Sequence, residues 1–79
     1  MKLYNSWRDA PEVPQGWKPA GAPGGFIKVP VRNKGLLQVL RGALSGRWEK
    51  VYRYGVDGTE VHYFIHESGK VCLVKHKVK

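Results

Sequence analysis

The sequence predicts an α+β fold, with one helix packed on a three-stranded antiparallel meander in the order α-β-β-β and an extended arm before it. Three observations predict this class. All five prolines precede residue 31, one leucine-rich stretch follows helical spacing, and three later runs are rich in β-branched and aromatic residues. With 79 residues the chain forms one domain, and it buries only about 60% of its unfolded surface.

Residues 1–30 are predicted to form an extended arm packed on the folded body. Proline and glycine are frequent there, and such a segment sustains neither a helix nor a central strand. Trp7 and Trp17 argue against simple disorder, because disordered segments contain few aromatic residues. We expect these two rings to anchor the arm. Residues 26–29 have the composition of a short edge strand that ends at Pro30.

The folded body is predicted over residues 31–79, and it begins with a helix. Asn33 is a suitable N-cap, because its side-chain oxygen can accept a hydrogen bond from the first helical turn. Gly46 supplies a C-terminal stop. The apolar residues at helical spacing between them are Leu36, Leu37, Leu40, Ala43 and Leu44.

Strand-like runs follow at residues 48–54, 60–66 and 71–77. Asp57-Gly58 and Ser68-Gly69 separate them, and both dipeptides are compatible with two-residue hairpin turns. The pairing that such turns set predicts which side chains share a face of the sheet.

This pairing places Arg53, His62 and Lys75 in one row across three strands. A central-strand histidine between two cations is suited to hold a phosphate, and the cations favour its neutral form. Such a group can accept the 2′-hydroxyl proton in RNA cleavage while the cations stabilise the phosphorane. We therefore predict these three residues as catalytic. The second acid–base role would come from His66, His76 or Tyr63. The alternative is a solvated polar row that binds phosphate or nothing.

The same pairing places Tyr52, Tyr54 and Tyr63 together on the other face. One interpretation is a platform that stacks unpaired bases, with Tyr63 as a nucleic-acid contact. The other is that these rings form the core beneath the helix or the arm. The core interpretation is favoured, because so small a chain has few aromatic residues to spare.

The charge of the chain predicts a polyanionic partner. It has 14 lysine and arginine residues against 6 acidic residues, a formal net charge of +8. Phosphate neutralisation supplies most non-specific nucleic-acid affinity, and we expect RNA rather than DNA. The alternative is a small inhibitor of phage type that binds an acidic surface of a host protein. The predicted nucleic-acid contacts, besides Tyr63, are Arg41, Arg47, Lys70, Lys77 and Lys79.

Several other classes of function are disfavoured. The single cysteine, Cys72, excludes an internal disulfide and a cysteine-based zinc cluster. The acidic residues are scattered and the histidines lack a ligand pattern, so neither metal nor cofactor is predicted. No apolar stretch reaches ten residues and no signal-peptide core follows Met1, which predicts a cytoplasmic protein without membrane contact. We expect a monomer or an edge-paired dimer.

Two segments of the body resemble a known family. Residues 60–64, Glu-Val-His-Tyr-Phe, and residues 69–76, Gly-Lys-Val-Cys-Leu-Val-Lys-His, are similar to parts of the HicA-type toxins. These small ribonucleases have a double-stranded-RNA-binding-like fold and cleave messenger RNA with a strand histidine. The resemblance implies that His62 is the catalytic residue. A second likeness is to the nuclease domains of bacterial contact-dependent toxins, which also pair a helix with a twisted antiparallel sheet.

Overall fold

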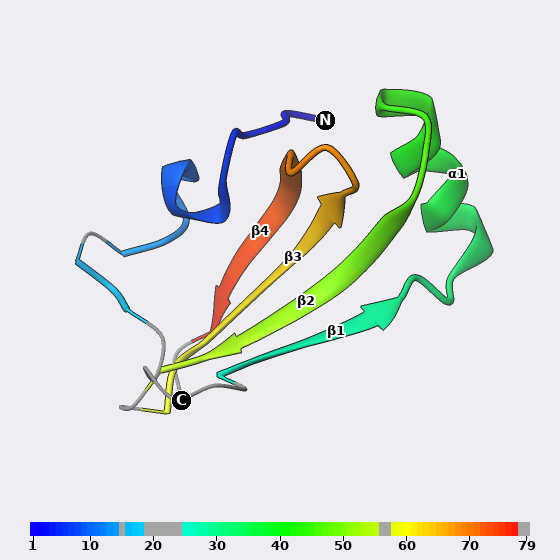
Figure 1. Cartoon of the computed structure of the whole chain (residues 1–79). Helices are drawn as coiled ribbons and strands as arrows, with labels where there is room; N and C mark the ends of the chain where they lie inside the picture. The colour runs from blue at the N-terminus through cyan, green and yellow to red at the C-terminus, as the bar shows by residue number, and fades with distance from the viewer. Residues whose placement is uncertain (15, 19–24, 56–57, 78–79) are drawn as a thin grey trace.

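The computed structural model describes residues 1–14, 16–18, 25–55 and 58–77. The four strands form one antiparallel sheet in the order β1-β2-β3-β4 (Figure 1). The α+β class is confirmed, but the sheet has four strands rather than three because residues 26–30 pair with residues 49–53 of β2. The elements in chain order are the 3₁₀ turn η1 (Trp7–Asp9), β1 (Phe26–Pro30), α1 (Lys34–Ala43), β2 (Trp48–Tyr54), β3 (Glu60–His66) and β4 (Val71–Lys77).

Helix α1 begins where the sequence predicts. The Asn33 side-chain oxygen accepts a hydrogen bond from the Leu36 backbone N–H at 3.1 Å, which confirms the N-cap. The helix ends at Ala43, before the predicted stop at Gly46, and the Leu44 N–H donates to the Leu40 carbonyl at 3.0 Å. Leu40 is fully buried.

Each face of the sheet is covered at least in part, and each carries its own apolar cluster. The N-terminal arm covers one, which we call the arm face, and α1 packs on the other, which we call the helix face. The arm lies beside β4 and α1 lies beside β2 (Figure 1). On the helix face, Leu40 packs with Trp48 and Cys72 at the end of the sheet where β2 begins.

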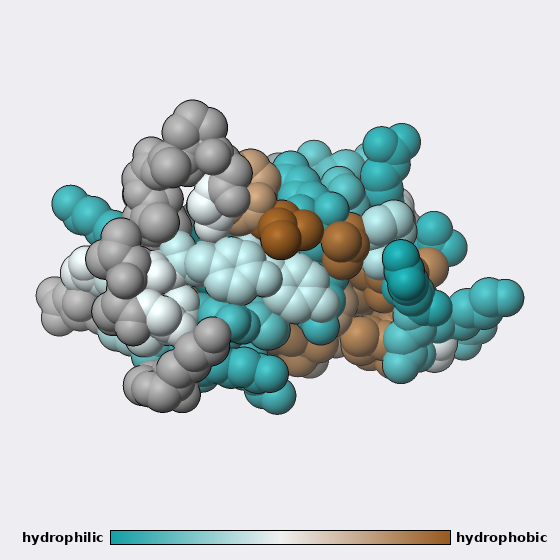
Figure 2. Space-filling model, turned by 90° about the horizontal axis from the view of Figure 1, so that it is seen from below, coloured by the Kyte–Doolittle hydropathy of each residue, from teal (hydrophilic) through white to brown (hydrophobic). Residues whose placement is uncertain are grey.

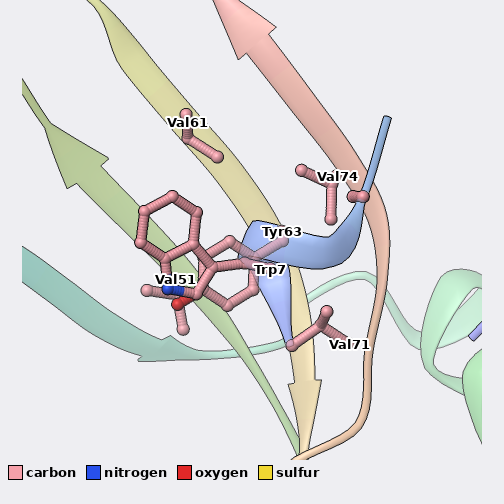
Figure 3. Packing of buried hydrophobic residues seen from close by; sticks show 7 residues of the cluster. Trp7, Val51, Val61, Tyr63, Val71 and Val74 are labelled. Atoms are coloured by element: carbon pink, nitrogen blue, oxygen red, sulfur yellow. The ribbon is translucent and has the colours of Figure 1, made fainter. Parts of the chain in front are cut away.

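The arm is held by its two tryptophans, as predicted. The Trp7 ring stacks on the Tyr63 ring with centroids 6.2 Å apart, and Trp17 meets Trp7 edge-on at 5.2 Å. Figure 3 shows Trp7 and Tyr63 among the valines of the sheet. Trp17 Nε1 also donates to Thr59 Oγ1 at 2.6 Å. The buried residues of this cluster are Trp7, Ala10, Val51, Val61, Tyr63, Val71 and Val74.

The β2–β3 hairpin differs from the prediction by one residue. Tyr54 pairs with Glu60, so an odd number of residues separates the strands and a two-residue turn does not fit. The predicted turn centre is only half described, because Asp57 lies outside the described residues. Gly58 has φ +85°, the left-handed conformation typical of the last position in a three-residue hairpin loop. The shift moves every side chain of β2 to the opposite face relative to β3.

The β3–β4 hairpin also has a three-residue loop in place of the predicted two-residue turn. The His66 N–H donates to the Lys70 carbonyl at 2.8 Å, and Gly69 has φ +97°. A bulge further along β4 then shifts the pairing by one residue, back to the predicted register. Leu73 lies at this bulge, where it is exposed and has φ +52°. His62 consequently pairs with Lys75, as predicted.

Candidate nucleic-acid interface

The part of the helix face that α1 leaves uncovered carries aromatic and basic side chains. We call it the basic groove, and its residues are Lys50, Tyr52, His62, Phe64, Lys75 and Lys77. These side chains share one face because they occupy alternate positions on their strands and pair directly across them. Two hollows adjoin the groove, one of about 470 Å³ beside β1 and one of about 760 Å³ at the β4 edge, and the second also reaches Glu12, Tyr63, Val74 and His76 on the arm side.

His62 lies at the centre of the groove, between Tyr52 on β2 and Lys75 on β4. Its ring meets the Tyr52 ring edge-on, with centroids 4.5 Å apart. Its Nε2 lies 2.8 Å from Glu60 Oε2, two residues earlier on the same face. In the neutral tautomer that donates Nε2–H to this carboxylate, Nδ1 carries the lone pair and can accept a proton. Only 13% of the His62 side chain is exposed.

Arg53 does not belong to this site, and the predicted Arg53–His62–Lys75 row is wrong. Because of the one-residue shift in the β2–β3 hairpin, Arg53 pairs with Val61 and lies on the arm face. There its Nε donates to the Tyr63 hydroxyl at 2.8 Å. Its guanidinium lies 4.9 Å from the centroid of the Trp7 ring. The row that exists is Tyr52–His62–Lys75.

The three tyrosines of the predicted platform are divided between the two faces. Tyr63 is 1% exposed beneath Trp7, so it cannot stack a base, and the core interpretation holds for it. Burial raises the pKa of Tyr63, while the hydrogen bond and positive charge of Arg53 act in the opposite direction. Tyr52 and Tyr54 lie on the helix face and are partly exposed.

Sequence reasoning did not single out Lys50, which the structure places on the floor of the groove. Its Nζ lies 4.9 Å from the centroid of Tyr52 and 5.7 Å from that of Phe64. A cation at these distances is attracted by both ring faces. The alternation of Lys50, Tyr52 and Tyr54 along one strand was the available signal, because alternate residues share a face.

The other predicted basic contacts are only partly brought together. Lys77 joins Lys75 in the groove, since both lie on the same face of β4. The remaining described ones lie at the opposite end of the strands, near Trp48 and His66. Arg41 Nε donates to the Gly46 carbonyl at 3.3 Å, Arg47 follows α1, and Lys70 Nζ donates to Asn5 Oδ1. Lys79 lies outside the described residues.

The other two histidines differ in their position relative to His62. His66 is buried and engaged at both ring nitrogens, since its Nδ1 accepts from the Ser68 N–H at 3.0 Å and its Nε2 lies 2.8 Å from the Ser45 carbonyl oxygen. His76 lies on the arm face opposite Val61. Of the proton-transfer partners predicted for His62, His66 is therefore excluded, whereas His76 and Tyr63 line the hollow at the β4 edge together with His62.

The chain matches no protein-family model, no curated protein and no solved structure. Within the described part of the chain, no three histidine, cysteine or acidic side chains are grouped so that they could hold a metal ion. No helix among those residues is long and apolar enough to cross a membrane.

Proposed function

We propose that this protein binds single-stranded RNA in the basic groove. The observation that carries the proposal is the arrangement of Lys50 between the Tyr52 and Phe64 rings, with Lys75 and Lys77 on the neighbouring edge strand. Aromatic rings stack on unpaired bases with about 1–3 kcal/mol per base, and lysines attract the phosphates between them. The groove combines both contributions on one uncovered surface.

Two further features support this proposal. The formal net charge of +8 favours a polyanionic partner over a neutral ligand. The Glu60–His62 pair presents hydrogen-bonding groups beside the rings, and such groups can contact the 2′-hydroxyl that distinguishes RNA from DNA.

Fluorescence anisotropy with a labelled RNA of about ten nucleotides tests the proposal, since single-strand binders cover about 4–16 nucleotides. We expect the logarithm of the affinity to fall linearly with the logarithm of the salt concentration, and RNA to bind more tightly than DNA of the same sequence. Binding that is independent of salt, or absent at low salt, would contradict the proposal and favour the acidic-protein partner.

A matched pair of variants locates the binding surface. Lys75→Gln and Lys28→Gln each remove one exposed lysine from an edge strand, but Lys75 faces the groove and Lys28 faces the arm side. We expect Lys75→Gln to weaken RNA binding and to reduce the magnitude of the salt slope by about 0.7, the value for one single-strand phosphate contact. Equal effects of the two substitutions would place binding elsewhere.

The Glu60–His62 pair favours a second candidate function, a metal-independent ribonuclease. In this reaction His62 Nδ1 takes the proton of the 2′-hydroxyl, whose oxygen attacks the phosphorus. The bond to the 5′-oxygen then breaks, and that oxygen takes a proton from water. The products are a 2′,3′-cyclic phosphate and a 5′-hydroxyl, and Lys75 would stabilise the charge of the intermediate.

This candidate is tested by incubating RNA with the protein and a metal chelator. We expect cyclic-phosphate ends to form with the wild type and not with His62→Gln, while anisotropy shows that the variant still binds RNA. Intact RNA after prolonged incubation with the wild-type protein would rule out the ribonuclease and leave the binding proposal standing.

A further inference from the structure

The two hollows of the basic groove meet at Lys50 and Phe64, which line both of them. The first, which we call the β1 hollow, lies between β1, the start of α1 and β2. The second, which we call the β4 hollow, lies along edge strand β4. A ligand that fills both must therefore pass over Lys50.

The β1 hollow has the chemistry of a pocket for a flat, largely apolar group. Val29 and Leu36 provide aliphatic walls, and Tyr52 and Phe64 provide aromatic surface. Its volume of about 470 Å³ is within the range of small-molecule pockets, about 300–1,000 Å³. Arg32 is exposed at its rim. Figure 2, which views the molecule from below, shows apolar and pale side chains at the surface between hydrophilic ones.

The β4 hollow has a different chemistry. Lys75 and Lys77 line it together with His62, and apolar surface comes from Phe64, Val74 and the exposed bulge residue Leu73. The hollow is thus lined by three lysines, Lys50, Lys75 and Lys77, and by one carboxylate, that of Glu12 from the arm. A phosphate-bearing group is favoured here over a neutral one.

Lys50 occupies the boundary between these two chemistries. Its ammonium group lies within 6 Å of both ring centroids, at 4.9 Å from Tyr52 and 5.7 Å from Phe64. Held there, it can contact an anion that joins a group in one hollow to a group in the other. The phosphodiester between two consecutive nucleotides is such an anion.

From this arrangement we propose that the groove binds two consecutive unpaired nucleotides of RNA, one base entering the β1 hollow, the next nucleotide occupying the β4 hollow, and Lys50 binding the phosphate between them. This inference deepens the proposed RNA binding and depends on it. The unit recognised is therefore a dinucleotide step.

The test compares four ligands by NMR titration of the full chain: adenosine monophosphate, the dinucleotide ApA, ApA with an uncharged methylphosphonate linkage, and a longer single-stranded RNA. For the wild type we expect ApA to bind about tenfold more tightly than the mononucleotide, a difference of about 1.4 kcal/mol. The uncharged linkage should remove most of that gain.

Two variants assign the contacts. Lys50→Gln should weaken ApA binding about as much as the uncharged linkage does, and the two changes together should cost no more than either alone, because they remove the same interaction. Val29→Trp should fill the β1 hollow and weaken ApA binding about tenfold. Ile27→Trp is its control, because Ile27 is on the same face of β1, is 49% exposed and does not line the hollow.

The outcomes separate this inference from the binding proposal. If the longer RNA binds but ApA binds no better than the mononucleotide, or if Lys50→Gln and the uncharged linkage act additively, the dinucleotide site is overturned and RNA binding stands. If no RNA binds at low salt, the proposed function itself fails. Circular dichroism of each variant shows whether it is folded. If Val29→Trp does not fold, the comparison of Lys50→Gln with the uncharged linkage decides the question by itself.

Discussion

Strand β2 carries a cation close to two aromatic rings on each face of the sheet, and the two arrangements differ in their surroundings. On the arm face, the guanidinium of Arg53 lies 4.9 Å from the Trp7 centroid and 4.8 Å from the Phe26 centroid. On the helix face, Lys50 lies near Tyr52 and Phe64 at similar distances. The first is closed by the arm, whereas the second lines two hollows.

The difference follows from what covers each face. The arm places Trp7 over the middle of the sheet, where it stacks on the buried Tyr63. Helix α1 is only ten residues long and packs near Trp48, so the rest of its face stays uncovered. The arm face therefore carries the larger buried cluster, and the helix face keeps an uncovered part.

The largest effect is expected from removing the arm's anchor. Trp7→Ala should lower the free energy of unfolding by about 3–5 kcal/mol, the usual cost of deleting a buried aromatic side chain. Tyr52→Ala, on the uncovered part of the helix face, should lower the free energy of unfolding by clearly less. Urea denaturation followed by tryptophan fluorescence measures both. Equal losses would mean that the two faces contribute equally to stability.

A substitution of Gly46 tests the close packing at the end of the helix face that α1 covers. This residue has φ +130°, and a Cβ atom there would lie 2.6 Å from His66 Nε2, so Gly46→Ala should destabilise the protein by about 2–3 kcal/mol. Gly42→Ala is the control, because a Cβ atom at this helical position meets open space. We expect it to stabilise by about 0.5–1 kcal/mol. Thermal unfolding measures both, and similar shifts would contradict the close contact.

The burial of Cys72 beneath α1 predicts a loss of stability at alkaline pH. Burial raises the pKa of this thiol from 9.0 to about 11. The stability that the buried, protonated thiol contributes is fully present below pH 9 and is lost as the pH rises toward 11. The reason is that the thiol of the unfolded chain releases its proton at a lower pH than the thiol of the folded chain. The loss should be on the order of 2 kcal/mol. Cys72→Ala should show a weaker alkaline dependence in urea titrations. An unchanged dependence would indicate that this thiol is not buried in solution.

The smallest effects are expected from two tyrosine substitutions on opposite faces. Tyr52→Leu should weaken RNA binding by about 1–2 kcal/mol through lost stacking while changing stability little. Tyr63→Phe removes the hydroxyl that accepts a hydrogen bond from Arg53, so it should reduce stability by about 1 kcal/mol and leave RNA binding unchanged. Anisotropy and urea denaturation on both variants test this reciprocal pattern. RNA binding that depends on Tyr63 would contradict the division of the faces.

Much of the local structure was predictable from the sequence. The three strands of the meander have the predicted bounds, Asn33 caps α1, and both tryptophans of the arm pack on the body. These features depend on side-chain periodicity, capping chemistry and the cost of exposing large rings, all of which act over short stretches of chain. The pairing of His62 with Lys75 was also predicted. The structure reaches it by another route, because the longer hairpin loop shifts the pairing by one residue and the bulge at Leu73 shifts it back.

The composition of each face was decided by the tertiary structure. A Gly in a hairpin loop can end a two-residue or a three-residue turn, and a difference of one residue moves a whole strand's side chains to the other face. That difference placed Arg53 under the arm and Lys50 in the groove. The sequence by itself determined the elements, their order and the positive charge. Loop length, the Leu73 bulge and the packing of arm and helix determined which cations meet, because these depend on contacts between distant segments.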